Sequence, residues 1–188
     1  MNRKEEIIIT FARLVRERGY AAVSMRDLAA SIGVKAASLY NHIPSKQAML
    51  EEIILRLATE FTSHVEDVSI ENLTAQEKLE KIIYHHIDIS VDRPYQVAAL
   101  NNDWYHLEED AKEKFKQMRL YYETKLRGII ILGIDKKELK NSSPDIILFT
   151  ILSTLRTLHL WVKKKEISTK EELKKELTEL LLRGVIMS

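Results

Sequence analysis

The amino-acid sequence predicts an all-α protein, with an N-terminal three-helix head that contains a helix-turn-helix and a larger C-terminal helical bundle. Three observations support this class. Apolar residues recur three and four positions apart along most of the 188 residues, which is the period of an amphipathic helix. Only five Gly and three Pro interrupt the chain. Ser or Thr followed three positions later by an acid, a signal for a helix start, occurs repeatedly.

Composition narrows the range of functions. With 45% apolar and 30% charged residues, the chain is globular and can bury a sizeable core. The absence of Cys excludes disulfides, thiolate metal ligands and cysteine nucleophiles. No uninterrupted apolar run approaches ~20 residues, so no membrane span is expected. The opening MNRKEEIIITFARL has acids before a short apolar run and no cleavage site, which indicates a cytoplasmic helix.

The charge is divided unevenly along the chain. The net charge of +1 is the sum of +4 over residues 1–50 and −3 over the other 138 residues. A basic end suits a surface that binds phosphate groups. Because such a segment also arises by chance, it supports a nucleic-acid motif without establishing one.

A first helix is predicted from about Lys4 to Arg18, and Gly19 ends it. Its apolar residues lie on one stripe, three or four positions apart. They are Ile7, Ile8, Phe11, Leu14 and Val15. The stripe is expected to pack on the next two helices and form a three-helix core.

The stretch from Ser24 to Leu50 predicts two short helices joined at Gly33, and then the start of a longer helix. Ser24 is a suitable N-cap, and Gly33 can adopt the backbone conformation that lets the next helix leave at a steep angle. The second helix, from Lys35 to about His42, has a thin face of small residues and is stopped by Pro44. Ser45 then caps a helix from Lys46 to about Val65.

Two short helices around a Gly turn form a helix-turn-helix, whose second helix enters the DNA major groove. An ordinary helical hairpin is the open alternative. We predict that Tyr40 and Lys46 contact phosphates and that the residues of the second helix lie nearest the bases. The predicted DNA-binding residues are Arg26, Lys35, Ala36, Ser38, Tyr40, Asn41, His42 and Lys46.

The sequence of this stretch resembles that of the DNA-binding head of the TetR (tetracycline-repressor) family of bacterial regulators. The matching residues are Ser24, Arg26-Asp27-Leu28-Ala29, Gly33-Val34, Leu39-Tyr40-Asn41-His42, Ser45-Lys46-Gln47 and Leu50. Three positions depart from the family pattern: Lys35 replaces a capping Ser or Thr, Ile43 replaces Phe, and Gln47 replaces an acid. The resemblance implies a dimeric, ligand-responsive regulator, usually a repressor, in which the helix from Lys46 transmits the ligand state to the head.

Residues 67–73 are predicted to form a loop, and Thr74 and Glu77 form a capping box that opens the next helix. His86 lies near the centre of that helix's apolar stripe. Two interpretations are open. His86 is either a core histidine hydrogen-bonded to a neighbour or a polar group that lines an effector cavity.

Residues 94–107, PYQVAALNNDWYHL, are expected to form an irregular aromatic element that closes one end of a pocket. A helix should then run from about Glu109 to Leu132, with Gly133 closing it. Arg119 on this helix either meets an anionic ligand or pairs with acids at the surface. A metal held by Asp103, His106 and Glu109 is conceivable, but we expect no metal. The predicted pocket residues are His86, Trp104, Phe115, Arg119 and Tyr122.

Ser143, Pro144 and Asp145 begin a helix that should reach about Lys165. This helix is apolar all round, so we expect a second subunit to cover one of its sides. Thr169 and Glu172 open a last amphipathic helix, and the two helices of each chain would form a four-helix dimer interface. The predicted interface residues are Leu155, Leu158, Trp161, Leu177 and Leu181.

Catalytic motifs are missing: there is no Gly-rich phosphate loop, Gly-x-Ser-x-Gly elbow or His-Glu-x-x-His. An enzyme site around His86, Trp104 and Arg119 is less favoured than a regulator. We therefore predict a DNA-binding domain over residues 1–62, with its motif at about 25–44, and an effector-binding and dimerisation domain over 63–188. The expected partners are double-stranded operator DNA, a small-molecule effector and a second copy, with no cofactor, metal or membrane. The alternative is a ligand- or partner-binding helical module whose head no longer binds DNA.

Overall fold

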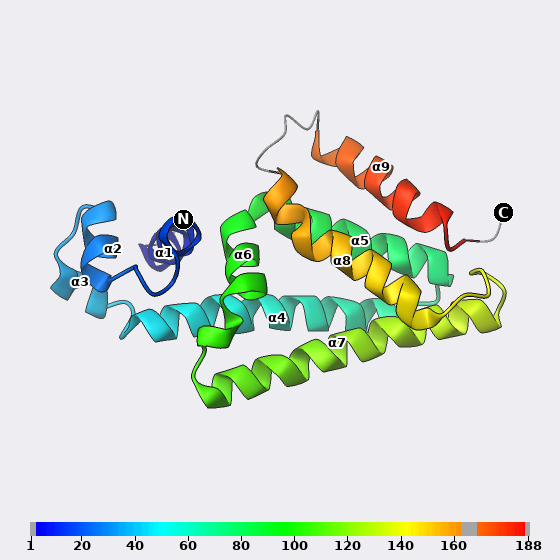
Figure 1. The fold of residues 1–188 in the computed structure, drawn as a ribbon, viewed down its shortest axis with the longest axis horizontal. Helices are drawn as coiled ribbons and strands as arrows, with labels where there is room; N and C mark the ends of the chain where they lie inside the picture. Colours follow the sequence, from blue (N-terminus) through cyan, green and yellow to red (C-terminus); the bar gives the residue numbers. More distant parts are fainter. Residues whose placement is uncertain (1–2, 163–168, 187–188) are drawn as a thin grey trace. The chain divides into compact units, whose positions relative to one another are not determined.

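The computed structural model describes residues 3–162 and 169–186 (Figure 1). Their regular secondary structure is helical, apart from an isolated antiparallel bridge between Leu139 and Ile186. The predicted all-α class is confirmed. The elements are α1 (Arg3–Arg18), α2 (Met25–Ser31), α3 (Ala36–Tyr40), α4 (Lys46–Ile70), α5 (Ala75–Asp92), α6 (Pro94–Asn102), the 3₁₀ turn η1 (Trp104–His106), α7 (Glu109–Asp135), α8 (Pro144–Val162) and α9 (Lys170–Arg183).

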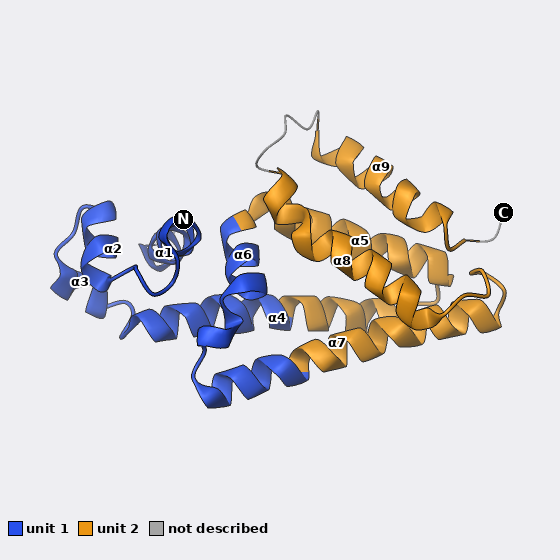
Figure 2. Cartoon of the chain, in the orientation of Figure 1, with its two compact units in different colours: residues 1–59, 95–117 blue, residues 60–94, 118–188 orange. Residues whose placement is uncertain are grey.

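The chain divides into two compact units (Figure 2). Unit 1 comprises residues 1–59 and 95–117, and unit 2 comprises residues 60–94 and 118–188. Because α6 and η1 belong to unit 1, they are grouped with the head, whereas the sequence assigned them to the C-terminal domain. The domain boundary at residues 62 and 63 stays a prediction.

The core of the head forms as the apolar stripe of α1 predicts. Ile7 and Phe11 of α1 are buried together with Leu28 of α2 and Leu39 of α3, each at most 1% exposed. Contacts between α1 and α2 and between α2 and α3 hold these helices in place. Met49 and Leu50, in the first turns of α4, are also fully buried, together with Ile43 before it.

The predicted caps of the head are present. The Ser24 side chain accepts the Asp27 N–H at 3.2 Å, and the Asp27 carboxylate accepts the Ser24 N–H at 2.8 Å, which completes a capping box. Hydrogen bonds from Ser24 lower the pKa of Asp27. Gly33 has a φ of +69°, so it makes the left-handed turn that its position predicts. Ser45 Oγ accepts the Ala48 N–H at 3.0 Å at the start of α4.

In unit 2, α5 packs against both α8 and α9. Its stripe of Leu79, Ile82, Ile83 and Ile87 is at most 1% exposed. The predicted capping box at Thr74 is present: the Thr74 side chain accepts the Glu77 N–H, and the Glu77 carboxylate accepts the Thr74 N–H. Burial of this stripe therefore stabilises the packing of α5 against its neighbouring helices.

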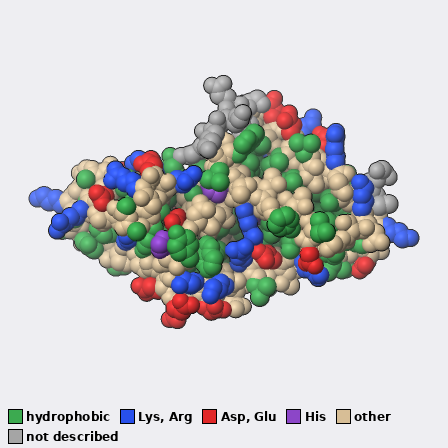
Figure 3. All heavy atoms as spheres, in the orientation of Figure 1, with side chains coloured by type: hydrophobic (Ala, Val, Ile, Leu, Met, Phe, Trp, Pro, Cys, Tyr) green, Lys and Arg blue, Asp and Glu red, His purple; other side chains and the backbone are tan. Residues whose placement is uncertain are grey.

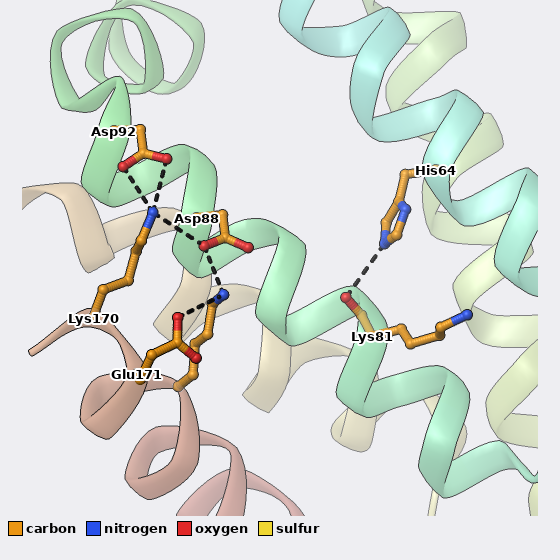
Figure 4. Close-up of polar contacts among 7 residues, drawn as sticks. His64, Lys81, Asp88, Asp92, Lys170 and Glu171 are labelled. Atoms are coloured by element: carbon orange, nitrogen blue, oxygen red, sulfur yellow. Dashed lines mark hydrogen bonds and ion pairs between the residues drawn. The ribbon is translucent and has the colours of Figure 1, made fainter.

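Two lysines of α9 bind two aspartates of α5 (Figure 4). Lys170 Nζ lies 2.9 Å from Asp92 Oδ1 and 3.4 Å from Asp88 Oδ1. Lys174 Nζ lies 2.8 Å from Asp88 Oδ1. Hydrogen bonds to these carboxylates raise the pKa of both lysines. These pairs favour one orientation of α9 on α5.

Two segments that were predicted to be irregular, residues 67–73 and 94–107, are partly helical. The helix α4 continues to Ile70, although residues 67–73 were expected to form a loop. Val65 and Val68 are both at most 1% exposed, so the i, i+3 apolar pattern continues and helix is retained. Residues 94–102 form a regular helix, and only the Asn-Asn-Asp sequence at its end breaks it, as expected from competing side chains.

Gly133 does not close α7, which runs on to Asp135. A Cβ at position 133 would clash with the Ala75 side chain and lie 2.8 Å from Leu139 Cδ1. Gly133 is therefore required by the close approach of the start of α5, and not by a helix end.

The helix α8 begins at Pro144 as predicted, and the predicted end near Lys165 lies outside the described residues. At α9, Thr169 Oγ1 accepts the Glu172 N–H at 3.1 Å and donates to the Glu172 carboxylate at 2.9 Å. Thr169 is thus confirmed as the N-cap. The Glu172 carboxylate accepts its hydrogen bond from the Thr169 hydroxyl, whereas in a capping box it would accept from the Thr169 N–H.

Candidate nucleic-acid interface

The second helix of the helix-turn-helix, α3, is anchored by one residue and exposed elsewhere. Leu39 is 1% exposed and faces the head core. Ser38, Tyr40 and Asn41 are exposed, with Tyr40 at 54%. Lys35, His42 and Arg26 are also exposed, and Ala36 is half-buried. Seven of the eight predicted DNA-binding residues therefore cluster on α2, α3 and their flanks, and their DNA contacts stay a prediction.

The start of α3 lacks a side-chain cap. Lys35 occupies the N-cap position in an extended conformation, and its side chain makes no capping hydrogen bond. The helix spans only five residues, and the Ser38 N–H donates to the Lys35 carbonyl at 2.9 Å in a tight i→i+3 bond. Lys35 stands where the family pattern has Ser or Thr, and the structure shows that this replacement removes the side-chain hydrogen bond that would cap the N-terminus of α3.

The eighth residue, Lys46, has an intramolecular partner. Its Nζ donates to the Tyr20 carbonyl at 2.9 Å and lies 4.2 Å from the centre of the Tyr20 ring. The ammonium group retains two further N–H donors. Lys46 is half-buried, so these contacts fix its position at the junction of α1 and α4.

A chain of contacts links this junction to η1 inside unit 1. The Tyr20 hydroxyl donates to Gln47 Oε1 at 2.7 Å, and Gln47 Nε2 donates to the His106 carbonyl at 3.1 Å. The Tyr20 ring stacks on the His106 ring with centroids 4.7 Å apart. Sequence reasoning missed this arrangement. The feature of the sequence that could have indicated it is Gln47, which stands where the TetR pattern has an acid. Unlike an ionised acid, an amide can both accept and donate a hydrogen bond.

In unit 2, the predicted pocket residues His86 and Tyr122 bind each other. His86 Nε2 lies 2.8 Å from the Tyr122 hydroxyl, and both residues are buried. The Phe61 ring stacks on His86 with centroids 4.4 Å apart. Burial lowers the pKa of His86 to about 3 and raises that of Tyr122, so both groups are neutral at pH 7. His86 is thus a hydrogen-bonded core histidine, and its contact with an effector stays a prediction.

The other three predicted pocket residues are placed differently. Arg119 is exposed, and its Nε donates to Glu123 at 3.2 Å, so it pairs with a surface acid. Trp104 and Phe115 lie in unit 1 with their ring centroids 5.8 Å apart. The residues described contain no group of three or more potential His, Asp or Glu metal ligands, so the alternative of a metal at Asp103 has no support.

The predicted dimer residues fall into two groups. Leu155 and Leu158 are 1% and 5% exposed within their own chain, because α8 turns them toward its own unit. Little of either side chain is left for a second copy to bury, and their place in an interface stays a prediction. Leu177 and Leu181 are partly exposed, and Trp161 is 47% exposed. The apolar residues that α8 and α9 do expose include Ile146, Phe149, Leu160 and Leu180. Figure 3 shows hydrophobic side chains at the surface of this face of unit 2.

Among the described residues, α8 alone is long and apolar enough to cross a membrane by length and composition. A third of this stretch is buried inside the chain. The core helix of a water-soluble protein meets the same criterion, so α8 carries no membrane assignment.

A short exposed helix held across a Gly turn on a basic three-helix head, joined to a helical body, defines a helix-turn-helix regulatory protein. Residues 7–53 match the family model for bacterial regulatory proteins of the tetR family, and residues 72–185 match that for the tetracyclin repressor-like C-terminal domain. The chain belongs to the TetR family.

Individual relatives agree with this assignment. The HTH-type transcriptional repressor KstR2 of Rhodococcus jostii (strain RHA1) is 27% identical over 101 residues, which cover 54% of this chain and 49% of the relative. The match thus spans about half the length of that relative. The ketosteroid transcriptional regulator KstR2 of Mycobacterium tuberculosis has a TM-score of 0.91 at 18% identity, covering 100% of this chain and 96% of that one.

A second solved structure, AibR in complex with isovaleryl coenzyme A and operator DNA, has a TM-score of 0.79 at 21% identity. The likeness covers 95% of this chain and 97% of that one. At these identities the two solved structures show that the fold is shared.

Proposed function

We propose that this chain is a cytoplasmic, homodimeric transcription regulator that binds double-stranded operator DNA and is released by a small-molecule effector. The observation that carries the proposal is α3: Leu39 anchors it, while its polar and small residues face solvent. Figure 3 shows Lys and Arg side chains projecting at the α2–α3 end of unit 1, which suits contact with phosphates.

The relatives support both halves of the proposal. KstR2 is a transcriptional repressor, and AibR was solved with both an acyl-coenzyme A and operator DNA. By analogy, repression relieved by an effector is the mode proposed for this chain. The effector is expected in the helical body, close to the buried His86 and Tyr122.

The proposed mechanism is a competition between two conformations. Operator DNA favours a spacing of the two heads that fits successive major-groove half-sites, and the effector favours another spacing. The effector shifts the balance only by the difference in its affinity for the two conformations.

Binding of the full chain to DNA from upstream of its own gene, followed by fluorescence anisotropy, tests the proposal. Tyr40→Phe should weaken binding about five-fold through the loss of one phosphate hydrogen bond of ~1 kcal/mol. Lys46→Ala should reduce the slope of log affinity against log salt by about 1. Tyr105→Phe and Lys116→Ala, at exposed positions away from the head motif, serve as controls.

Unchanged affinity in both head variants would refute the assigned contacts. A chain that is folded but binds no DNA under any salt condition would instead identify the helical module with a degenerate head.

A further inference from the structure

A hollow of about 270 Å³ lies within unit 2, where the end of α4, the start of α5 and the second half of α7 meet. Leu73, Ala75, Ile129 and Leu132 give it an apolar lining. Its charged lining consists of three lysines, Lys78, Lys125 and Lys136, and one acid, Glu138, and the hydroxyl residues Ser69 and Thr124 also line it. The hollow thus combines an apolar wall with an excess of positive charge.

The positive charge of the hollow is not neutralised by ion pairs. In the described part of the chain, Lys78, Lys125 and Lys136 form no salt bridge, whereas Lys170 and Lys174 of the same unit are paired with aspartates. Lys78 Nζ donates to the Ser69 carbonyl at 2.8 Å, which leaves two of its N–H donors.

Glu138, the single acid in the hollow, is already engaged. Its Oε2 accepts the Ala75 N–H at 2.6 Å, so it holds the first residue of α5. This contact engages one of its two carboxylate oxygens with the backbone. Lys125 Nζ lies 5.3 Å from the centre of the Tyr121 ring, a contact that leaves its positive charge in place.

Gly128 keeps the hollow open. It lies in the interior of α7 and lines the hollow, and a Cβ at this position would meet no atom within 4 Å. Glycine in a helix interior is less stable than alanine, and no close packing at Gly128 requires it, unlike Gly133. A larger residue there would fill the space that a ligand needs.

We propose that this hollow binds a small amphipathic anion, with a carboxylate or phosphate group held by Lys78, Lys125 and Lys136 and a short apolar chain against Ile129 and Leu132. Charge-assisted hydrogen bonds to several lysines favour an anion over a neutral molecule of the same shape. The volume lies just below the ~300–1,000 Å³ of sites for drug-sized ligands, so the ligand is small.

Isothermal titration calorimetry of the full chain tests the site with three probes of one chain length. Hexanoate and monohexyl phosphate carry the two anionic groups, and hexanamide is the neutral control. At least one anion should bind ten-fold or more tightly than hexanamide, and the anion that binds better identifies the source of the charge. Equal affinity for all three probes, or no binding of either anion, would overturn the proposal.

Variants locate the binding. Gly128→Leu should weaken anion binding at least ten-fold while it maintains or raises the melting temperature, because leucine is the better helix former. Gly128→Ala, which adds only a methyl group, serves as the matched control for helix stability. Lys136→Gln should weaken binding of the anions but not of hexanamide, and Lys175→Gln, at an exposed lysine of α9, should change neither.

Anion binding that persists at full strength in both Gly128→Leu and Lys136→Gln would place the ligand elsewhere and reject the site. No DNA enters this experiment, so its outcome is independent of the proposed regulatory function.

Discussion

Gln47 illustrates how one side chain can tie the head to a segment distant in sequence. Its amide accepts from the Tyr20 hydroxyl and donates to the carbonyl of His106, 59 positions away. An ionised glutamate could accept the first bond but could not donate the second. The amide at this position therefore suits the two contacts it makes, and the acid of the family pattern would not.

Gln47→Glu is expected to destabilise the protein by about 1–3 kcal/mol, because a carboxylate would face the partly buried His106 carbonyl with no proton to share. Urea unfolding at pH 7 measures the loss. Tyr20→Phe removes only the hydroxyl bond and should cost less, about 1 kcal/mol. A Gln47→Glu protein as stable as the parent would show that the bond contributes nothing.

The burial of His85 and His86 leads us to expect that the free energy of unfolding declines in mild acid. Burial lowers the pKa of His86 to about 3 and that of His85 to about 4, against about 6.5 for an unfolded chain. Below pH 6.5 the unfolded state therefore binds protons that the folded state does not, and stability falls with pH until these low folded-state pKa values are reached. His85 also has the His64 ring 3.9 Å away, a neighbour that further disfavours its charging.

For His86 the expected slope is about half of 1.4 kcal/mol per pH unit at pH 6.5 and approaches about 1.4 kcal/mol per pH unit near pH 5, with a smaller share from the more exposed His85. Urea unfolding at pH 7, 6 and 5 measures it. His86→Gln retains an acceptor for the Tyr122 hydroxyl and should remove most of the slope. An unchanged slope in this variant would assign the pH dependence to other groups.

At the scale of secondary-structure elements, the two glycines of α7 have opposite roles. Gly133 permits the close approach of Ala75 and Leu139, whereas Gly128 faces open space. Both lie inside the same helix, so a helix-propensity argument treats them alike. Only the packing of neighbouring elements distinguishes them.

Gly133→Ala should destabilise unit 2 by about 1–3 kcal/mol through overpacking against α5. Gly128→Ala should stabilise it by up to about 1 kcal/mol through helix propensity. Thermal unfolding of the two variants measures whether their changes in stability have opposite signs. Two variants that change stability in the same direction would contradict the packing assigned to these positions.

At the scale of the whole molecule, the exposed apolar face of α8 requires an explanation. Phe149 is 72% exposed and Ile146 is 62% exposed on a helix whose other side is buried in unit 2. Exposed apolar residues of this size on a regular helix indicate an interface. A second copy of the chain is the occupant under the proposed function.

Sedimentation equilibrium at micromolar concentration should therefore give a dimer, and Phe149→Glu should shift it toward monomer by burying an unpaired charge at the interface. Leu120→Glu, at a 59% exposed position of α7, is the control and should leave the dimer intact. A monomeric parent protein, or a dimer that tolerates Phe149→Glu, would refute an interface at this face.

The sequence alone determined the features that depend on residues within one helical turn. These include the all-α class, the Ser24 and Thr74 capping boxes, the left-handed turn at Gly33 and the uncapped start of α3. Such features could be predicted because the atoms that satisfy them lie three or four positions apart. The prediction that His86 is a polar group on an apolar helix stripe also depended only on the local sequence pattern.

The tertiary structure decided what depends on residues far apart in the chain. It placed α6 and η1 in the unit of the head, joined Gln47 to His106, and turned Leu155 and Leu158 inward. It also made Gly133 a packing contact instead of a helix end. Helical periodicity shows which side of a helix is apolar, but only packing determines what that side meets, because burial depends on neighbours that no local pattern specifies.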